Sequence, residues 1–238
     1  MQERSIAPAA VLGVLVALGF AIGGYFVGEG FRRGRSSDRF VTVKGLAERE
    51  VPANLALWPI VFTVTADDLA ALQRAVDENA GKIHSFLGDT FRKEEVSLSM
   101  PRITDREAMG LYQQGRQLER YVAEATVTLR TSRIDAVRTA MERSGELVKQ
   151  GVALIRSYEY NTQYLYTDLE KIKPEMIAEA TRDARRAAEQ FAEDSGSRVG
   201  AIRKAQQGYF VIEDRDPFSP EFKKIRVVTT IEYFLVDD

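Results

Sequence analysis

The chain contains no cysteine among its 238 residues. This absence excludes disulfides, thiolate nucleophiles, iron–sulfur clusters and cysteine-ligated zinc sites. Histidine is almost absent as well, since His84 is the only one, which excludes a metal site built on two histidines. His84 lies beside the apolar stripe of a predicted helix, where a lone histidine is more often a structural or surface residue than a ligand or base.

A strong charge of either sign is also missing. The chain has 33 basic and 35 acidic residues and a pI near 5.7, so it lacks the basic surface that binds nucleic acid. One loop gathers acidic residues at Glu213, Asp214, Asp216 and Glu221, but their spacing does not match an EF-hand, and such clusters are mostly solvated. No P-loop or G-x-S-x-G motif is present. The sequence therefore predicts a non-enzymatic protein without a metal or cofactor.

A long uncharged stretch follows the short N-terminal flank, residues 1–5. Residues 6–28 carry no charge over 23 positions, and as a helix they would span about 34 Å, enough for a ~30 Å hydrocarbon core. A cleaved signal peptide is the alternative, but its apolar region is usually ~7–15 residues and ends at an A-x-A-like site. Only Gly28-Glu29-Gly30 offers a comparable site, so the sequence favours a retained, single-pass membrane anchor.

Small residues recur at a spacing of four within this segment, at Gly19 and Gly23 and at Gly24 and Gly28. Such faces allow membrane helices to approach closely and self-associate. Glycine is also common in single anchors, so self-association through this face and an ordinary anchor stay equally open.

The orientation of the anchor is contested by a basic tether at residues 29–39. Arg32, Arg33, Arg35 and Arg39 follow the apolar segment, and the positive-inside rule would place the following domain in the cytoplasm. The family resemblance described below indicates the opposite side.

Residues 40–238 predict one α+β domain with about three helices, because strands and helices mix without strict alternation. The predicted strands cover residues 40–48, 53–65, 95–103, 121–130, 152–160, 199–205 and 224–236. The predicted helices cover 67–87, capped by Thr65 or Asp67, 132–145, and 174–195, beginning at Pro174.

Alternation and helical spacing predict which residues form the core. The second strand alternates Trp58, Ile60, Phe62 and Val64 onto one face, and Pro59 requires an edge or a bulge there. The last helix carries a stripe of mostly small residues: Ile177, Ala180, Ala184, Ala188 and Phe191.

The loop at residues 208–222 combines prolines and charges with aromatic residues. Tyr209, Phe210, Phe218 and Phe222 lie outside any regular periodicity, and exposed aromatics are favoured anchors at protein interfaces. They form the candidate interface of this chain. An equal alternative is that the rings fold back over a sheet edge.

Three segments resemble the SIMPL domain family. They are VTVKGLAEREVPANLALWPIVFTV at 41–64, EATRDARRAAEQFAEDSGSRVG at 179–200, and RVVTTIEYFLV at 226–236. The resemblance implies a bacterial periplasmic or membrane-associated domain that forms an oligomer, ring- or channel-like in some relatives. It carries no catalytic residues, and many relatives have a cleaved signal where this chain has an anchor.

The leading expectation is a homo-oligomeric envelope protein anchored in the bacterial inner membrane, with its SIMPL-like domain in the periplasm and a cage- or channel-like role. The alternative is a periplasmic module that binds a small ligand or a stress-related partner, for which a concave apolar pocket would argue. An enzyme with paired carboxylates is a third reading without a supporting motif.

Overall fold

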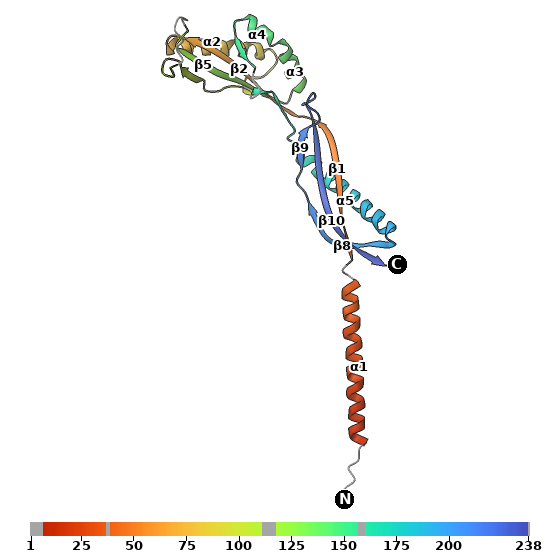
Figure 1. Ribbon diagram of the computed structural model, residues 1–238. Helices are drawn as coiled ribbons and strands as arrows, with labels where there is room; N and C mark the ends of the chain where they lie inside the picture. The colour runs from red at the N-terminus through yellow and green to blue at the C-terminus, as the bar shows by residue number, and fades with distance from the viewer. Residues whose placement is uncertain (1–6, 37–38, 111–117, 157–159, 238) are drawn as a thin grey trace. The chain divides into compact units, whose positions relative to one another are not determined.

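The computed structural model describes residues 7–36, 39–110, 118–156 and 160–237 (Figure 1). The first element is the helix α1, Ala7–Ser36. In the described part of the chain, no helix is both long and apolar enough to cross a membrane. The predicted transmembrane span is therefore not confirmed.

Contacts along the chain divide it into two compact units. Unit 1 comprises Met1–Glu48, Lys173–Phe210 and Arg226–Asp238, and unit 2 comprises Arg49–Ile172 and Val211–Ile225. The sequence predicts one domain over residues 40–238, and of the four unit boundaries in that range two fall inside strands, one inside a helix and one between two strands. Both units combine helices with antiparallel strands, so the predicted α+β class is confirmed.

Unit 2 is built on a sheet whose two central strands are β2, Leu55–Ala66, and β5, Tyr121–Thr131. Short strands flank this pair, and the sheet order is β3-β5-β2-β6, with β4 beside β5 and β7 beside β2. The short strands are β3 (Val96–Leu98), β4 (Arg102–Asp105), β6 (Ala153–Ile155) and β7 (Gln163–Leu165). The helical elements of the unit are α2 (Leu69–Gly88), the 3-10 turn η1 (Lys93–Glu95), α3 (Ile134–Arg143) and α4 (Gly145–Lys149).

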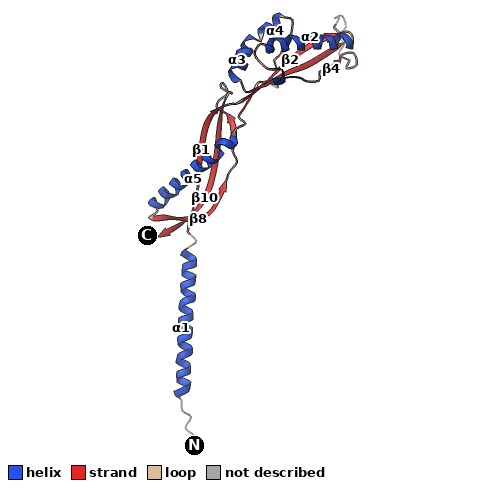
Figure 2. Ribbon diagram, turned by 180° about the vertical axis from the view of Figure 1, so that it is seen from behind, coloured by secondary structure: helices blue, strands red, loops and turns tan. Residues whose placement is uncertain are grey.

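The core of unit 2 lies between one face of this sheet and the three α-helices (Figure 2). Large residues of β2 stand directly opposite smaller ones of β5, as in the pairs Phe62 with Ala125 and Val64 with Ala123. All four side chains are at most 9% exposed, which confirms the predicted alternation. Burying a side chain the size of Phe62 contributes about 1.5–3 kcal/mol to folding.

The N-cap of helix α2 lies one residue after Asp67 and three residues after Thr65, the two predicted caps. This N-cap is Asp68, whose carboxylate accepts a 2.8 Å hydrogen bond from the Ala71 N–H, and this satisfies one free amide of the first turn. Asp67 instead accepts from the Arg120 N–H at 3.3 Å. The choice of Thr65 or Asp67 as cap is therefore wrong.

A compact ionic cluster joins η1 to the end of β5. The Glu95 carboxylate accepts from the Thr131 hydroxyl at 2.5 Å, from Arg133 at 2.7 Å and from the Arg92 N–H at 2.8 Å. Burial acts to raise the pKa of Glu95, but these three donors together outweigh it and hold the pKa below its ordinary value. The cluster favours the ionised carboxylate in the folded state.

Unit 1 places one long helix on a sheet with the order β1-β10-β8. The strands are β1 (Phe40–Pro52), β8 (Ser197–Gln207) and β10 (Phe222–Asp237), and β9 (Val211–Asp214), which belongs to unit 2, also pairs with β10. The helix is α5 (Leu169–Asp194). Its buried stripe consists of Met176, Ala180, Ala184, Ala188 and Ala192.

The alanine stripe brings α5 unusually close to β1. A Cβ added at Gly45 would lie 1.9 Å from the Ala180 carbonyl oxygen and 2.3 Å from the Ala184 nitrogen. The Leu46 N–H also donates to the Asp183 carboxylate of α5 at 2.9 Å. Since β1 is an edge strand, Asp183 satisfies an edge amide that would otherwise be open.

Strand β8 is an exposed and irregular edge. Its pairing with β10 is regular from Lys204 to Gln207, then shifts register around Arg203 and again before Val199. The displaced Arg203 side chain lies over the Phe40 ring at 4.0 Å and bonds to Glu232 at 3.3 Å.

Several boundaries differ from the predicted ones. Helix α5 begins at Leu169, so Pro174 lies inside it, where the missing N–H removes one helical hydrogen bond. Phe191 is 50% exposed and Ala192 occupies the buried position instead. Of the predicted strand at 152–160, β6 forms Ala153–Ile155, and residues 157–159 lie outside the described part of the chain. The sequence does not predict β7 and β9, because strands this short carry too little alternation to be recognised.

Candidate functional site: a cavity at a break in the sheet

The pairing of β2 is interrupted at Pro59 on one side only. With β5 the register runs without a gap from Ala56 through Pro59 to Ala66. On its other side β2 pairs with β6 at residues 61–63 and with β7 at residues 55–57. Residues 58–60 thus have no strand partner there among the described residues. Proline lacks the N–H that a ladder requires, so a partner strand gains little at this position.

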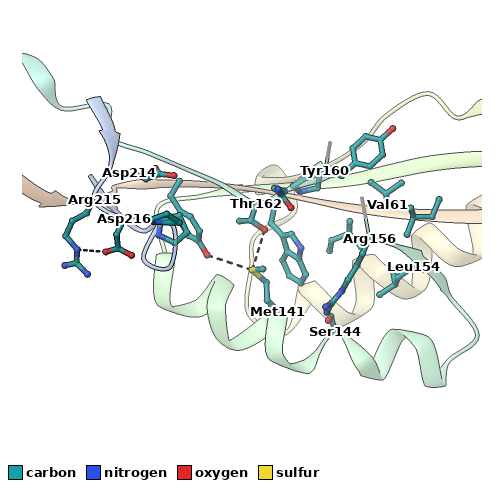
Figure 3. A pocket seen from close by; sticks show the side chains of 18 residues that line it. Val61, Met141, Ser144, Leu154, Arg156, Tyr160, Thr162, Asp214, Arg215 and Asp216 are labelled. Carbon is teal, nitrogen blue, oxygen red and sulfur yellow. Dashed lines mark hydrogen bonds and ion pairs between the residues drawn. The ribbon is translucent and has the colours of Figure 1, made fainter. Parts of the chain in front are cut away.

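A cavity of about 1010 Å³ lies at this break within unit 2. Its walls come from β2, the end of α3, β6, Arg156, residues 160–162 before β7, and the loop after β9 (Figure 3). The apolar part of the lining consists of Trp58, Pro59, Ile60, Val61, Met141, Leu154, Ile155, Pro217 and Pro220. The polar part consists of Ser144, Arg156, Tyr160, Asn161, Thr162, Tyr164, Asp214, Arg215 and Asp216.

Two hydroxyl groups in the cavity are directed at a sulfur atom. The Thr162 hydroxyl lies 3.6 Å and the Tyr164 hydroxyl 3.9 Å from Met141 Sδ, and Figure 3 shows both dashed lines meeting there. A thioether is a weak acceptor. Burial, and to a smaller extent the charge of Glu221, raise the pKa of Tyr164. The phenol therefore remains a neutral hydrogen-bond donor at physiological pH.

The two carboxylates of the lining are neutralised by their own neighbours. Asp214 forms an ion pair with Lys223, and Asp216 accepts from Arg215 at 3.0 Å. Arg156, by contrast, makes no ion pair or hydrogen bond with any residue that the structure describes. The cavity thus combines nine apolar lining residues with hydroxyl donors and with an arginine that has no partner among the described residues.

Sequence reasoning did not find this cavity. Pro59 within an otherwise regular strand is the one signal in the sequence, and it predicts an edge or a bulge at this position. The structure retains β2 as a central strand and places the disturbance in its neighbour, which splits into β6 and β7. Periodicity cannot show such a gap because the partner strand is distant in sequence.

The predicted aromatic interface divides into exposed and partly covered residues. Tyr209 is 94% and Phe218 93% exposed. Phe210 and Phe222 are half-buried, and the Arg215 guanidinium lies 4.4 Å from the Phe222 ring centre. Tyr209 and Phe210 belong to unit 1, whereas Phe218 and Phe222 belong to unit 2.

The glycines predicted to mediate self-association all lie in α1 and are exposed. A Cβ added at Gly19, Gly23, Gly24 or Gly28 would meet no atom within 4 Å. Their surface is therefore open to another helix in the described structure.

The acidic residues of the loop do not converge. Glu213 is exposed and Glu221 is half-buried, while Asp214 and Asp216 are held in the separate ion pairs described above. Within the described residues no three histidine or carboxylate side chains lie close enough to hold a metal ion. His84 is a half-buried residue of α2.

The observations define an α+β protein with two antiparallel sheets, one long alanine-faced helix and a cavity at a strand break. The model of the SIMPL family, described as a protein of unknown function (DUF541), matches residues 41–232. The chain belongs to this family, which confirms the resemblance of its three segments. A comparison with curated proteins found no match.

Proposed function

We propose that this protein is a non-enzymatic envelope protein that self-associates while held at the bacterial inner membrane by residues 6–28. The observation that carries the proposal is the exposure of Tyr209 and Phe218, each above 90%. Large exposed rings are costly in water and are typical anchors of protein interfaces. The uncharged stretch at 6–28 supports the anchor, and the family resemblance supports a periplasmic domain and a ring-, cage- or channel-like assembly.

Anchoring strengthens weak lateral contacts through effective concentration. Subunits confined to one surface meet far more often than subunits free in solution, so modest interfaces suffice for assembly. The open glycine face of α1 offers a second contact between anchors, since small residues permit close helix packing in lipid.

Mass measurement of the full-length protein in detergent tests self-association. The protein is expected to exceed the 26.7 kDa of one chain, and a Tyr209→Ser/Phe218→Ser double variant is expected to lose mass. Met100→Ser is the matched control, because Met100 is 94% exposed but lies outside the aromatic loop. A strict monomer at micromolar concentration, or a double variant with unchanged mass, would refute the proposed interface.

Two measurements test the anchor and its orientation. Alkaline carbonate should leave the full chain in the membrane pellet, whereas a chain lacking residues 6–28 should be released. Reporter fusions after Asp238 should be active in the periplasm. Cytoplasmic activity would instead support the positive-inside reading of Arg32, Arg33, Arg35 and Arg39.

The cavity at Pro59 favours a second candidate function, a module that binds a small ligand. Its volume suits a small molecule, and its lining of nine apolar and nine polar residues offers both an apolar surface and hydrogen-bonding groups to a ligand. Binding and self-association are compatible in one chain, and they are tested separately.

A further inference from the structure

The chemistry of the cavity lining restricts what it can hold. About half of its lining residues are apolar, with Trp58 and Ile60 contributed by β2 and Leu154 by β6. Trp58 is only 7% and Ile60 only 3% exposed, so both are part of a firm core and not of a movable surface. These walls favour the hydrocarbon or ring portion of a ligand.

Charge at the cavity selects for an anion. Asp214 and Asp216 carry their own cations, so they offer little to a cationic ligand. Arg156 has no partner among the described residues, and its planar guanidinium matches a carboxylate in a two-pronged hydrogen bond.

The neutral polar groups point to the same conclusion. Among the described residues, the hydroxyls of Thr162 and Tyr164 donate to the Met141 sulfur alone, which an oxygen anion would replace as a far stronger acceptor. Because the pKa of Tyr164 is raised, the phenol presents a proton and not a second negative charge.

We propose that the cavity binds a small amphiphilic carboxylate, with its apolar body against the wall formed by Trp58, Ile60 and Leu154, and its anionic group held by Arg156 and the hydroxyls of Thr162 and Tyr164. The inference rests on the second candidate function, that the cavity holds a ligand, and does not depend on self-association.

A built-in reporter makes the test direct. Trp58 is the only tryptophan of the chain and lines the cavity, so its fluorescence reports occupancy without labelling. Full-length protein in detergent is titrated with cyclohexylpropionate, the matching alcohol and the matching amine, each against a detergent blank, and calorimetry repeats the titrations. The carboxylate is expected to bind about 10-fold or more tightly than the alcohol, and the amine most weakly.

Two variants and a control assign the selectivity to named groups. Arg156→Gln is expected to weaken carboxylate binding by about 10-fold to 100-fold and to leave alcohol binding unchanged. Tyr164→Phe should weaken the carboxylate by about 10-fold. Arg74→Gln, an exposed residue of α2 outside the lining, should change neither.

The possible failures are distinguishable. Equal binding of all three probes, or an unchanged carboxylate affinity in Arg156→Gln, would overturn the assignment of the ligand class while a binding site remains. Absence of binding by every probe in both methods would overturn the ligand-binding function together with the inference. The mass of the protein in detergent reports on self-association independently of either result.

Discussion

Replacement of Gly45 by alanine tests the closest contact of unit 1. The new Cβ would lie 1.9 Å from the Ala180 carbonyl oxygen, 2.3 Å from the Ala184 nitrogen and 2.8 Å from the Ala184 Cβ, whereas real Cβ contacts essentially never fall below 3.0 Å. Two of these three neighbours are backbone atoms, which cannot turn aside as a flexible side chain can. Helix α5 would therefore have to move by roughly 1 Å or more from β1.

The cost of this movement is large relative to the stability of a domain. Overpacking typically costs about 1–3 kcal/mol, and here the displaced helix also loses contacts along its alanine stripe. We expect Gly45→Ala to lower the free energy of unfolding by about 3 kcal/mol or more, a large share of the ~5–15 kcal/mol that a domain possesses.

Urea unfolding of the full chain, followed by circular dichroism, measures the effect, and Trp58 fluorescence shows when unit 2 unfolds. The matched control is Gly81→Ala in α2, where an added Cβ meets nothing within 4 Å. That change should stabilise the protein by about 0.5–1 kcal/mol, because alanine favours a helix over glycine. If the Gly45 variant unfolds at the same urea concentration as the parent, the close approach of α5 to β1 is wrong.

Three further changes test other parts of the fold. Glu95→Gln should lower the free energy of unfolding by about 1–2 kcal/mol at pH 7. Because folding lowers the pKa of this carboxyl, the ionised group stabilises the fold above its unfolded pKa, and this stabilisation is lost as the pH falls through its folded pKa. The stabilities of parent and variant should therefore converge in acid unfolding. Phe62→Ala should cost about 3–5 kcal/mol in thermal or urea unfolding, because the ring is fully buried, whereas Met100→Ala should have little effect. Asp68→Ala should lower the free energy of unfolding by about 0.5–2 kcal/mol, because the N-cap hydrogen bond of α2 is lost. A change smaller than the error of the measurement would show that this cap does not stabilise the protein.

Sequence patterns predict the long helices and strands but miss the shortest strands, and the reason is physical. The alternation through Phe62 and Val127 marks strands with one buried face, and both side chains are fully buried in the structure. The three-residue strands β6 and β7 have no such pattern of their own, since they exist only where β2 offers an edge on either side of Pro59. Their position is decided by tertiary pairing and not by local periodicity.

The candidate cavity escaped prediction for the same reason. Arg156 and Tyr164 look unremarkable in sequence, and they become neighbours of one cavity only because the chain leaves β2 after β6 and returns as β7. The exposed rings of Tyr209 and Phe218 could be identified as interface candidates from their irregular setting. Whether each ring is covered depends on contacts with distant residues, as the stacking of Arg215 on Phe222 illustrates.

The register shifts of β8 bear on how this chain avoids aggregation. An incoming strand needs an evenly spaced row of amides and carbonyls, but the regular pairing of β8 is divided by the register shifts into two short stretches, Ser197–Val199 and Lys204–Gln207. Lysine and arginine at the shift around Arg203 add charge where a neighbouring sheet would have to stack. The open border of this sheet is therefore a poor template for the addition of a strand from another copy, which lowers the risk of cross-β aggregation.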